Sequence, residues 1–133
     1  MASFTAPGRP GRDRTSEHES GSGTRREPPA GGAFPYLVWR LQRGYDVRGD
    51  LKGAKMGPKD YLRRFYYDTV GYAEEAHEYL VRLVGADRVM MGSDYCFPIA
   101  YERPVQVVTE HPTWLPEQKS MILEGNARRL LKI

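Results

Sequence analysis

The chain has 133 residues, enough for one domain with a single core but only about half the length of a complete eight-stranded parallel barrel. Its 20 basic and 17 acidic residues give a net charge of +3, and no short run concentrates lysine and arginine, so a nucleic-acid partner is not expected. No run reaches the roughly 18 apolar residues of a membrane span, and residues 1–30 lack the apolar centre of a secretory signal. The single cysteine, Cys96, excludes an internal disulfide, and a reducing, cytoplasmic location fits best.

The first thirty residues differ in composition from everything that follows. They contain no Ile, Leu, Val, Tyr or Trp, and after Met1 the only large apolar side chain is Phe4. Such a segment cannot bury enough surface to offset the entropy lost on ordering. Because the composition changes abruptly at Gly31, we expect a disordered, low-complexity tail over residues 1–30 and a folded part over residues 31–133.

The folded part opens with a predicted helix. Pro35 can begin it, the apolar residues of 36–43 can bury one side, and Gly44 is expected to end it. Residues 45–58 are polar and broken by glycines, which predicts a surface loop. Residues 61–69, "YLRRFYYDT", favour a strand, although the first of them could instead finish a short helix.

The clearest helix covers residues 72–85, "YAEEAHEYLVRLVG". Its apolar side chains recur at helical spacing at Ala76, Leu80, Leu83 and Val84, and Gly85 is placed to cap its end. A strand over residues 88–92 follows after a linker of two residues, as is typical of an α-to-β turn.

Three further helices are predicted, over residues 104–110, over residues 116–124, and from Asn126 to the end of the chain. The order of strand, helix, strand and helices is that of parallel βα units, so the fold class is α/β. Active groups of such folds stand at the carboxyl ends of the strands. Asp68 and Asp94 follow the two strands and are expected to face the same mouth.

The stretch "RVMMGSDYCFP" places Asp94 directly after Gly-Ser at the end of an apolar strand. Such an aspartate is commonly a turn former or helix cap that accepts hydrogen bonds from nearby backbone N–H groups. A catalytic carboxylate is the alternative, and the local sequence leaves both open.

Three separated segments carry a family resemblance: "GGAFPYLVWRLQRGY", "GADRVMMGSDYCFP" and "ILEGNARRLLKI". In this order they resemble amidohydrolase-related metal enzymes, the group that includes aminocarboxymuconate-semialdehyde decarboxylase and resorcylate-type decarboxylases. The resemblance implies that residues 31–133 form the C-terminal portion of a (β/α)8 TIM barrel of the metal-dependent hydrolase type. In that setting, Asn126 is expected to place the last helix against the closing strand.

The resemblance also implies roles for particular residues. Asp94 would be a catalytic residue and a ligand of a divalent metal, usually zinc, which can activate water or polarise a substrate oxygen. Asp68 and Tyr95 would contact the substrate. Two alternatives stay open, since Asp68 could instead cap the helix that begins near Tyr72, and Tyr95 could merely pack the final loop.

The family pattern is incomplete in this chain. The family's site uses an H-x-H pair and two further histidines, whereas this sequence has three histidines, His18, His77 and His111, and no H-x-H. Pro29 stands where the family's catalytic histidine would be. Each of the three histidines is expected to be solvated or to serve packing, with His77 near the outer or flanking face of its helix.

The resemblance therefore leads to two hypotheses. The first is part of a metal-dependent hydrolase or non-oxidative decarboxylase for a small carboxylated substrate, inactive on its own because the histidines are missing. The second is a non-catalytic barrel remnant that acts by association with another chain, either a complementing barrel piece or a second copy, since two parallel strands leave open edges.

Overall fold

The computed structural model describes residues 29–51, 53 and 55–133, so nearly all of the tail predicted for residues 1–30 lies outside the described residues. The α-helices are α1 (Phe34–Val47), α2 (Pro58–Tyr61), α3 (Glu74–Val84), α4 (Pro104–Thr109), α5 (Pro116–Ser120) and α6 (Asn126–Leu131). Shorter helical turns are η1 (Pro29–Gly31), η2 (Gly49–Leu51), η3 (Leu62–Arg64), η4 (Ala86–Arg88) and η5 (Met121–Gly125), of which η5 is a π-helix. The strands are β1 (Tyr67–Asp68) and β2 (Val89–Met90).

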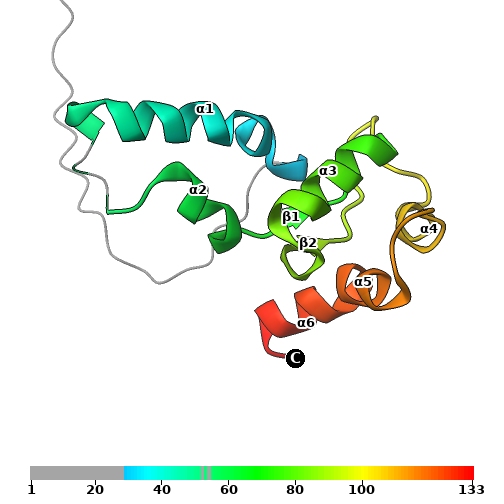
Figure 1. Cartoon of the computed structure of the whole chain (residues 1–133). Coiled ribbons are helices and arrows are strands. Elements are labelled where there is room, and N and C mark those ends of the chain that lie inside the picture. The colour runs from blue at the N-terminus through cyan, green and yellow to red at the C-terminus, as the bar shows by residue number, and fades with distance from the viewer. Residues whose placement is uncertain (1–28, 52, 54) are drawn as a thin grey trace, which may run out of the picture.

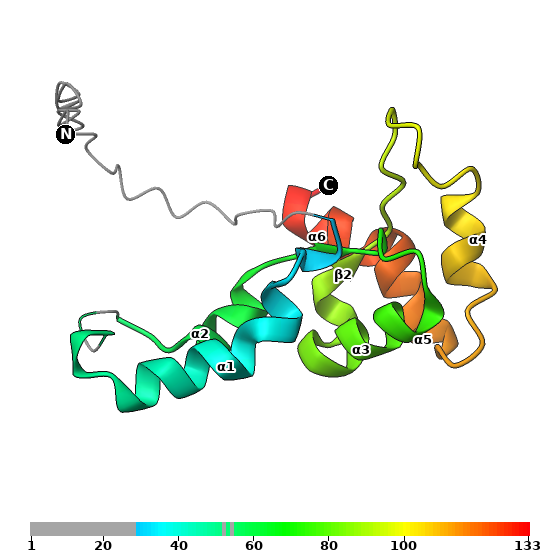
Figure 2. The same cartoon turned by 90° about the horizontal axis from the view of Figure 1, so that it is seen from above.

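The two strands form a parallel pair, with Tyr67 opposite Val89 and Asp68 opposite Met90. Helix α3 connects them, which confirms the predicted strand–helix–strand order. The pair lies in the middle of the folded part, with α1 and α2 on one side and α4, α5 and α6 on the other (Figures 1 and 2). Among the described residues this is a partial barrel, with two of its strands.

The core lies between the strand pair and the helices. Its buried members come from every part of the described chain, and the side chain of Tyr67 is 1% exposed while its hydroxyl donates to the carbonyl of Leu62. The buried cluster comprises Val38, Leu62, Tyr67, Leu80, Val81, Val84, Ala86, Val89, Val108, Trp114 and Ile122. Among the residues that the structure describes, no helix combines the length and apolar character needed to cross a bilayer.

Helix α3 forms where the apolar spacing predicts it, and Gly85 ends it with a φ of 87°, which favours glycine. Its buried face is Leu80, Val81, Val84 and, against expectation, His77, which is only 3% exposed. The prediction that His77 lies near the outer face was wrong. Its Nε2 lies 2.7 Å from the carbonyl oxygen of Thr69, at the end of β1, and this hydrogen bond satisfies one polar atom of the buried ring.

Two predicted boundaries differ from the structure. Helix α1 continues through Gly44 to Val47, because a glycine inside a helix costs only about 1 kcal/mol, and the carbonyl of Gly44 accepts the N–H of Arg48. The predicted strand over residues 61–69 shortens to β1, since its first residues form the end of α2 and η3. The alternative of a short helix at this point was therefore correct.

Candidate active-site loop at the ends of the two strands

Asp68, the last residue of β1, is 5% exposed. Its Oδ1 accepts the N–H of Ala30 at 2.8 Å and the N–H of Val70 at 3.0 Å. The carboxylate thus links η1 to the end of β1 and stabilises the turn that follows β1. It does not cap α3, whose N-cap position is Ala73 with no side-chain hydrogen bond. A contact of Asp68 with substrate stays a prediction.

Asp94 lies beyond β2, half-buried, at the start of the loop that leads to α4. Its Oδ2 accepts the hydroxyl of Tyr72 at 3.0 Å. Both partners have a left-handed φ, 61° for Asp94 and 57° for Tyr72. This region costs a tyrosine about 1–2 kcal/mol, whereas an aspartate adopts it more readily, and such costs cluster at functional sites. The strained backbone of Tyr72, beside Asp94, therefore marks this corner of the molecule as a candidate site.

The phenol of Tyr72 is also placed by a ring contact with Tyr101, whose centroid lies 4.9 Å away. Partial burial, and then the hydrogen bond to the charged carboxylate of Asp94, raise the pKa of Tyr72 above its ordinary value. Because the proton stays on the phenol, Tyr72 is a donor to Asp94 at neutral pH. This contact was not predicted, because it joins residues 22 positions apart.

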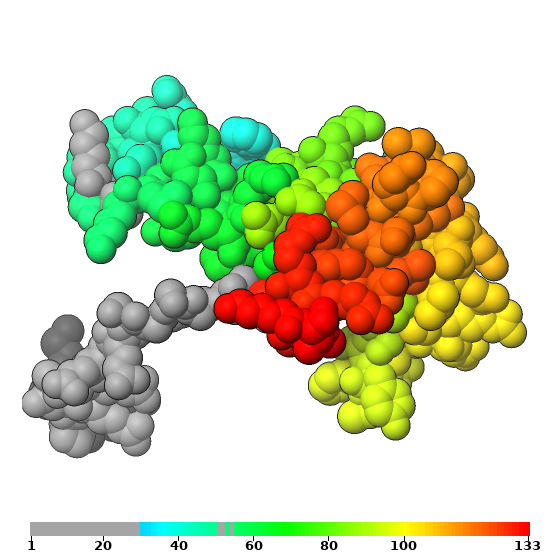
Figure 3. Space-filling model, turned by 90° about the horizontal axis from the view of Figure 1, so that it is seen from below, coloured from blue at the N-terminus to red at the C-terminus, as the bar shows by residue number. Residues whose placement is uncertain are grey.

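The loop after Asp94 projects from the body of the molecule (Figure 3). Its base is closed by the N–H of Tyr101 bonding the carbonyl of Ser93 at 2.8 Å. Between these residues, Tyr95 is 88% exposed and Phe97 is 64% exposed. The exposure of Tyr95 argues against the alternative that it packs the loop, and its role toward substrate stays a prediction.

The described residues do not fit a divalent metal by themselves. No three His, Cys, Asp or Glu side chains among them are close enough to share one ion. Asp68 Oδ1 is engaged by two backbone N–H groups, and His77 and His111 belong to a buried aromatic cluster in which His111 stacks on Trp114 at 3.8 Å. A metal at Asp94 would need further ligands, and we derive no chemical step through one.

An open cavity of about 550 Å³ adjoins the site, between the first turn of α3 and α4. Tyr72, which bonds Asp94, lines this cavity together with Tyr101, and the buried His77 and His111 line it as well. Burial lowers the pKa of His77, which keeps this imidazole neutral. The cavity and its histidines were not predicted, since they depend on how His111 and Trp114, in the segment after α4, pack against His77 on α3.

A family model described as amidohydrolase matches residues 20–133. The chain belongs to this family, as its three motifs predicted. Two curated relatives are the 2-amino-3-carboxymuconate-6-semialdehyde decarboxylases of Dictyostelium discoideum and Caenorhabditis elegans. They are 33% and 30% identical to this chain over 103 and 105 residues, which cover 76% and 77% of it. The chain spans only 29% and 26% of their lengths.

Solved structures confirm the fold. The 5-carboxyvanillate decarboxylase of Sphingomonas paucimobilis is 32% identical with a TM-score of 0.66, over 78% of this chain and 32% of that one. A dihydroxybenzoic acid decarboxylase from Polaromonas, solved with manganese and 2-nitroresorcinol, has the same TM-score at 24% identity, over 77% of this chain and 32% of that one. The prediction of part of an amidohydrolase-type TIM barrel is therefore confirmed.

Proposed function

We propose that this chain carries the strand-end aspartate of a non-oxidative decarboxylase site for a small carboxylated aromatic substrate. One observation carries the proposal: Asp94 follows β2 at the mouth of a barrel portion whose relatives, at 30% to 33% identity, are named decarboxylases. Active groups of TIM barrels stand at this end of the strands. The same relatives favour decarboxylation over the hydrolysis that the sequence left open.

Within this proposal, Tyr72 holds the carboxylate of Asp94 toward the mouth through its 3.0 Å hydrogen bond. Asp68 and Tyr95 would contact the substrate from the ends of the same two strands. A divalent metal bound to Asp94, manganese as in the Polaromonas relative or the zinc expected from the family resemblance, would take its other ligands from outside the described residues.

The chain alone is proposed to be inactive, because the described residues provide too few metal-binding side chains. The test uses the purified 133-residue chain with 5-carboxyvanillate or 2,6-dihydroxybenzoate and added Mn²⁺ or Zn²⁺. We expect no release of CO₂. Turnover by the chain alone, lost on Asp94→Ala and on chelation, would overturn this part of the proposal.

A complementary experiment tests the role of Asp94 in an assembled barrel. The purified chain is mixed with the part of the Dictyostelium relative that precedes its matching segment. Sedimentation first establishes that the two pieces associate, and CO₂ release is then measured on the assembled sample. We expect turnover that Asp94→Ala abolishes and that Glu117→Gln, an exposed change on α5, leaves intact. An assembled, active pair that tolerates Asp94→Ala would contradict the role of Asp94.

The second candidate function is association without catalysis, either with a complementing barrel chain or with a second copy. It is favoured by large apolar side chains that the described chain leaves exposed on α1 and on the loop after β2, namely Tyr36 (79%), Trp39 (57%), Tyr95 (88%) and Phe97 (64%). Sedimentation of the chain alone tests it, and a monomer that unfolds cooperatively would argue against it. The cytoplasmic location stays a prediction.

A further inference from the structure

The cavity between α3 and α4 contains two buried histidines whose hydrogen bonding is incomplete. Its volume of about 550 Å³ is that of a small-molecule site. His77 and His111 line it, and each is only 3% exposed. Within the part of the chain that the structure describes, Nδ1 of His77 and Nε2 of His111 are buried and have no hydrogen-bond partner. Buried polar atoms without a partner are rare, so both nitrogens require an explanation.

The contacts of His77 fix the position of its proton. Its Nε2 lies 2.7 Å from the carbonyl oxygen of Thr69, and a carbonyl oxygen can only accept a hydrogen bond. Burial lowers the pKa of His77, so the ring is neutral and carries a single proton. That proton is therefore on Nε2, and Nδ1 presents a lone pair that can only accept.

The contacts of His111 lead to the same result. The hydroxyl of Thr113 donates its proton to Oε1 of Glu78 at 2.9 Å. Toward Nδ1 of His111, which lies 3.5 Å away, the same hydroxyl oxygen can therefore only accept. A proton on Nδ1 leaves Nε2 of the neutral ring as an acceptor. Both unpaired nitrogens thus require a donor.

The charged residues of the cavity favour a positive ligand. Glu74, Glu102 and Glu110 contribute three carboxylates to the lining, against the single guanidinium of Arg103. The negative charge of Glu74 acts on His77, where it favours a positive charge. A ligand that carries both N–H donors and a positive charge therefore matches the cavity.

The remaining lining suits an apolar body attached to that charge. Tyr72 and Tyr101 contribute aromatic rings, whose faces attract cations, and Ile99 adds an aliphatic side chain. The ring centroids of His77 and His111 are 6.0 Å apart. One ammonium group can bridge two imidazoles at this separation with two hydrogen bonds of about 2.9 Å.

We propose that this cavity binds a small organic ammonium ion, a protonated primary amine on an apolar body, whose N–H groups donate to Nδ1 of His77 and to Nε2 of His111. Glu74 and Glu110 balance its charge. A divalent metal is disfavoured, because no three His, Cys, Asp or Glu side chains of the described chain could hold one ion. An anion is disfavoured because it offers only acceptors to nitrogens that are themselves acceptors. The inference is independent of the proposed decarboxylase function, whose carboxylated substrate is a ligand of the opposite charge.

The first experiment records long-range ¹H–¹⁵N spectra of the histidine rings while the ¹⁵N-labelled full chain is titrated with benzylamine. We expect unprotonated Nδ1 in His77 and unprotonated Nε2 in His111, and both signals should shift saturably with a dissociation constant of about 1 mM or lower. Benzyl alcohol and benzoate have the same aromatic body without the positive charge, and they should bind at least about tenfold more weakly. A proton on either nitrogen, no saturable shift with benzylamine, or equally tight binding of benzoate would overturn the inference. Tighter binding of Zn²⁺ than of benzylamine at the same two nitrogens would assign the pair to a metal and overturn it as well.

The second experiment repeats the benzylamine titration with variants. Glu74→Gln and Glu110→Gln each remove one exposed carboxylate from the lining and should weaken binding about two- to fivefold. Glu75→Gln, exposed on the same turn of α3 but outside the lining, is the matched control and should bind as the wild type does. His111→Phe keeps a ring that can stack on Trp114 but removes Nε2, so binding should weaken about tenfold or more. Unchanged affinity in the two glutamine variants of the lining, or a loss as large in Glu75→Gln, would contradict the inference even if His111→Phe does not fold.

Discussion

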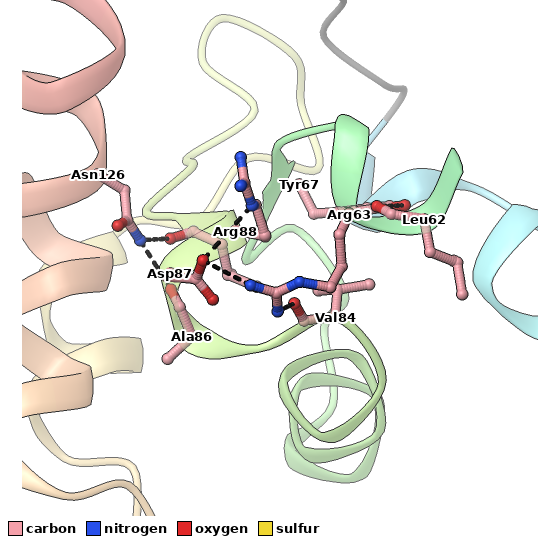
Figure 4. Close-up of polar contacts among 9 residues, drawn as sticks. Leu62, Arg63, Tyr67, Val84, Ala86, Asp87, Arg88 and Asn126 are labelled. Carbon is pink, nitrogen blue, oxygen red and sulfur yellow. Dashed lines mark hydrogen bonds and ion pairs between the residues drawn. The ribbon is translucent and has the colours of Figure 1, made fainter. Parts of the chain in front are cut away.

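At its first residues β2 is enclosed by the chain's own C-terminal helices, whereas beyond its last residue the chain enters a loop whose aromatic side chains face outwards. Asn126 at the enclosed end is fully buried, while Tyr95 at the open end is 88% exposed. The enclosed end contains its own hydrogen-bond partners, and the open end does not contain the ligands that the family chemistry requires. The buried contacts of Asn126 (Figure 4) and the candidate catalytic residue Asp94 therefore lie toward opposite ends of the same strand.

The largest effect is expected from a substitution that disrupts the hydrogen bonds at the enclosed end of β2. Asn126→Asp replaces the donating Nδ2 by a carboxylate oxygen beside the carbonyls of Ala86 and Val89. An uncompensated buried charge costs about 3–5 kcal/mol, so we expect a loss of that order in the free energy of unfolding. Urea unfolding followed by far-UV circular dichroism measures it. A loss below about 1 kcal/mol would mean that Asn126 is not buried against these carbonyls.

The next largest effect on stability is expected at Gly92, between the enclosed start of β2 and the exposed loop that follows it. A side chain at Gly92 would come within 2.9 Å of the Cβ of Asp68 and of a methyl group of Val70, so Gly92→Ala should destabilise the chain by about 1–3 kcal/mol. Gly44→Ala is the matched control, because that position in α1 is open, and it should stabilise by about 0.5–1 kcal/mol. Thermal unfolding of both variants compares them, and equal effects would contradict the packing at Gly92.

A smaller effect depends on pH. Burial lowers the pKa of His77 below its ordinary value of 6.5, so the folded state favours the neutral imidazole. The corresponding stability is complete above pH 6.5 and is lost as the pH falls below it, because the unfolded state then binds the proton more readily. The groups around the ring are His111, Trp114 and Glu74, and the charge of Glu74 opposes the shift.

Urea unfolding between pH 7.5 and 5 measures this dependence, with His77→Gln as the comparison. The glutamine keeps a donor for the carbonyl of Thr69 and does not titrate, so its stability should decline less as the pH falls. Identical declines in the two chains would show that the acid sensitivity arises from other groups.

Sequence reasoning succeeded where short-range signals decide the structure. The spacing of Leu80 and Val84 and the cap at Gly85 locate α3, and the apolar run that follows locates β2. It failed at His77, where distant packing decides, because the burial of this ring depends on Thr69, His111 and Trp114. It also failed at Gly44, because glycine only weakly disfavours a helix and α1 continues through it.

The candidate site likewise has one feature that the local sequence predicts and one that only the tertiary fold decides. The position of Asp94 at a strand end was predicted, and its place beyond β2 agrees with that prediction. Its contact with Tyr72 was not predictable, because both residues must first adopt left-handed backbone conformations, which are uncommon for tyrosine above all. A local pattern thus indicated which carboxylate to consider, and the tertiary fold determined its partner.

The smallest expected effect is a change in the pKa of Tyr72, which reports whether Asp94 contacts this phenol at the open end of β2. Burial is the largest cause that raises the pKa of Tyr72, and the hydrogen bond and charge of Asp94 follow. Asp94→Asn removes the negative charge but keeps an oxygen that can accept the hydrogen bond, so the pKa of Tyr72 should fall only part of the way toward 10.0. Ultraviolet titration of the wild type and of Tyr72→Phe identifies the signal, and Glu102→Gln is the control on the same loop. No change with Asp94→Asn would place the carboxylate away from Tyr72, and Asp94 would then be free to adopt a different position at the mouth of a completed barrel.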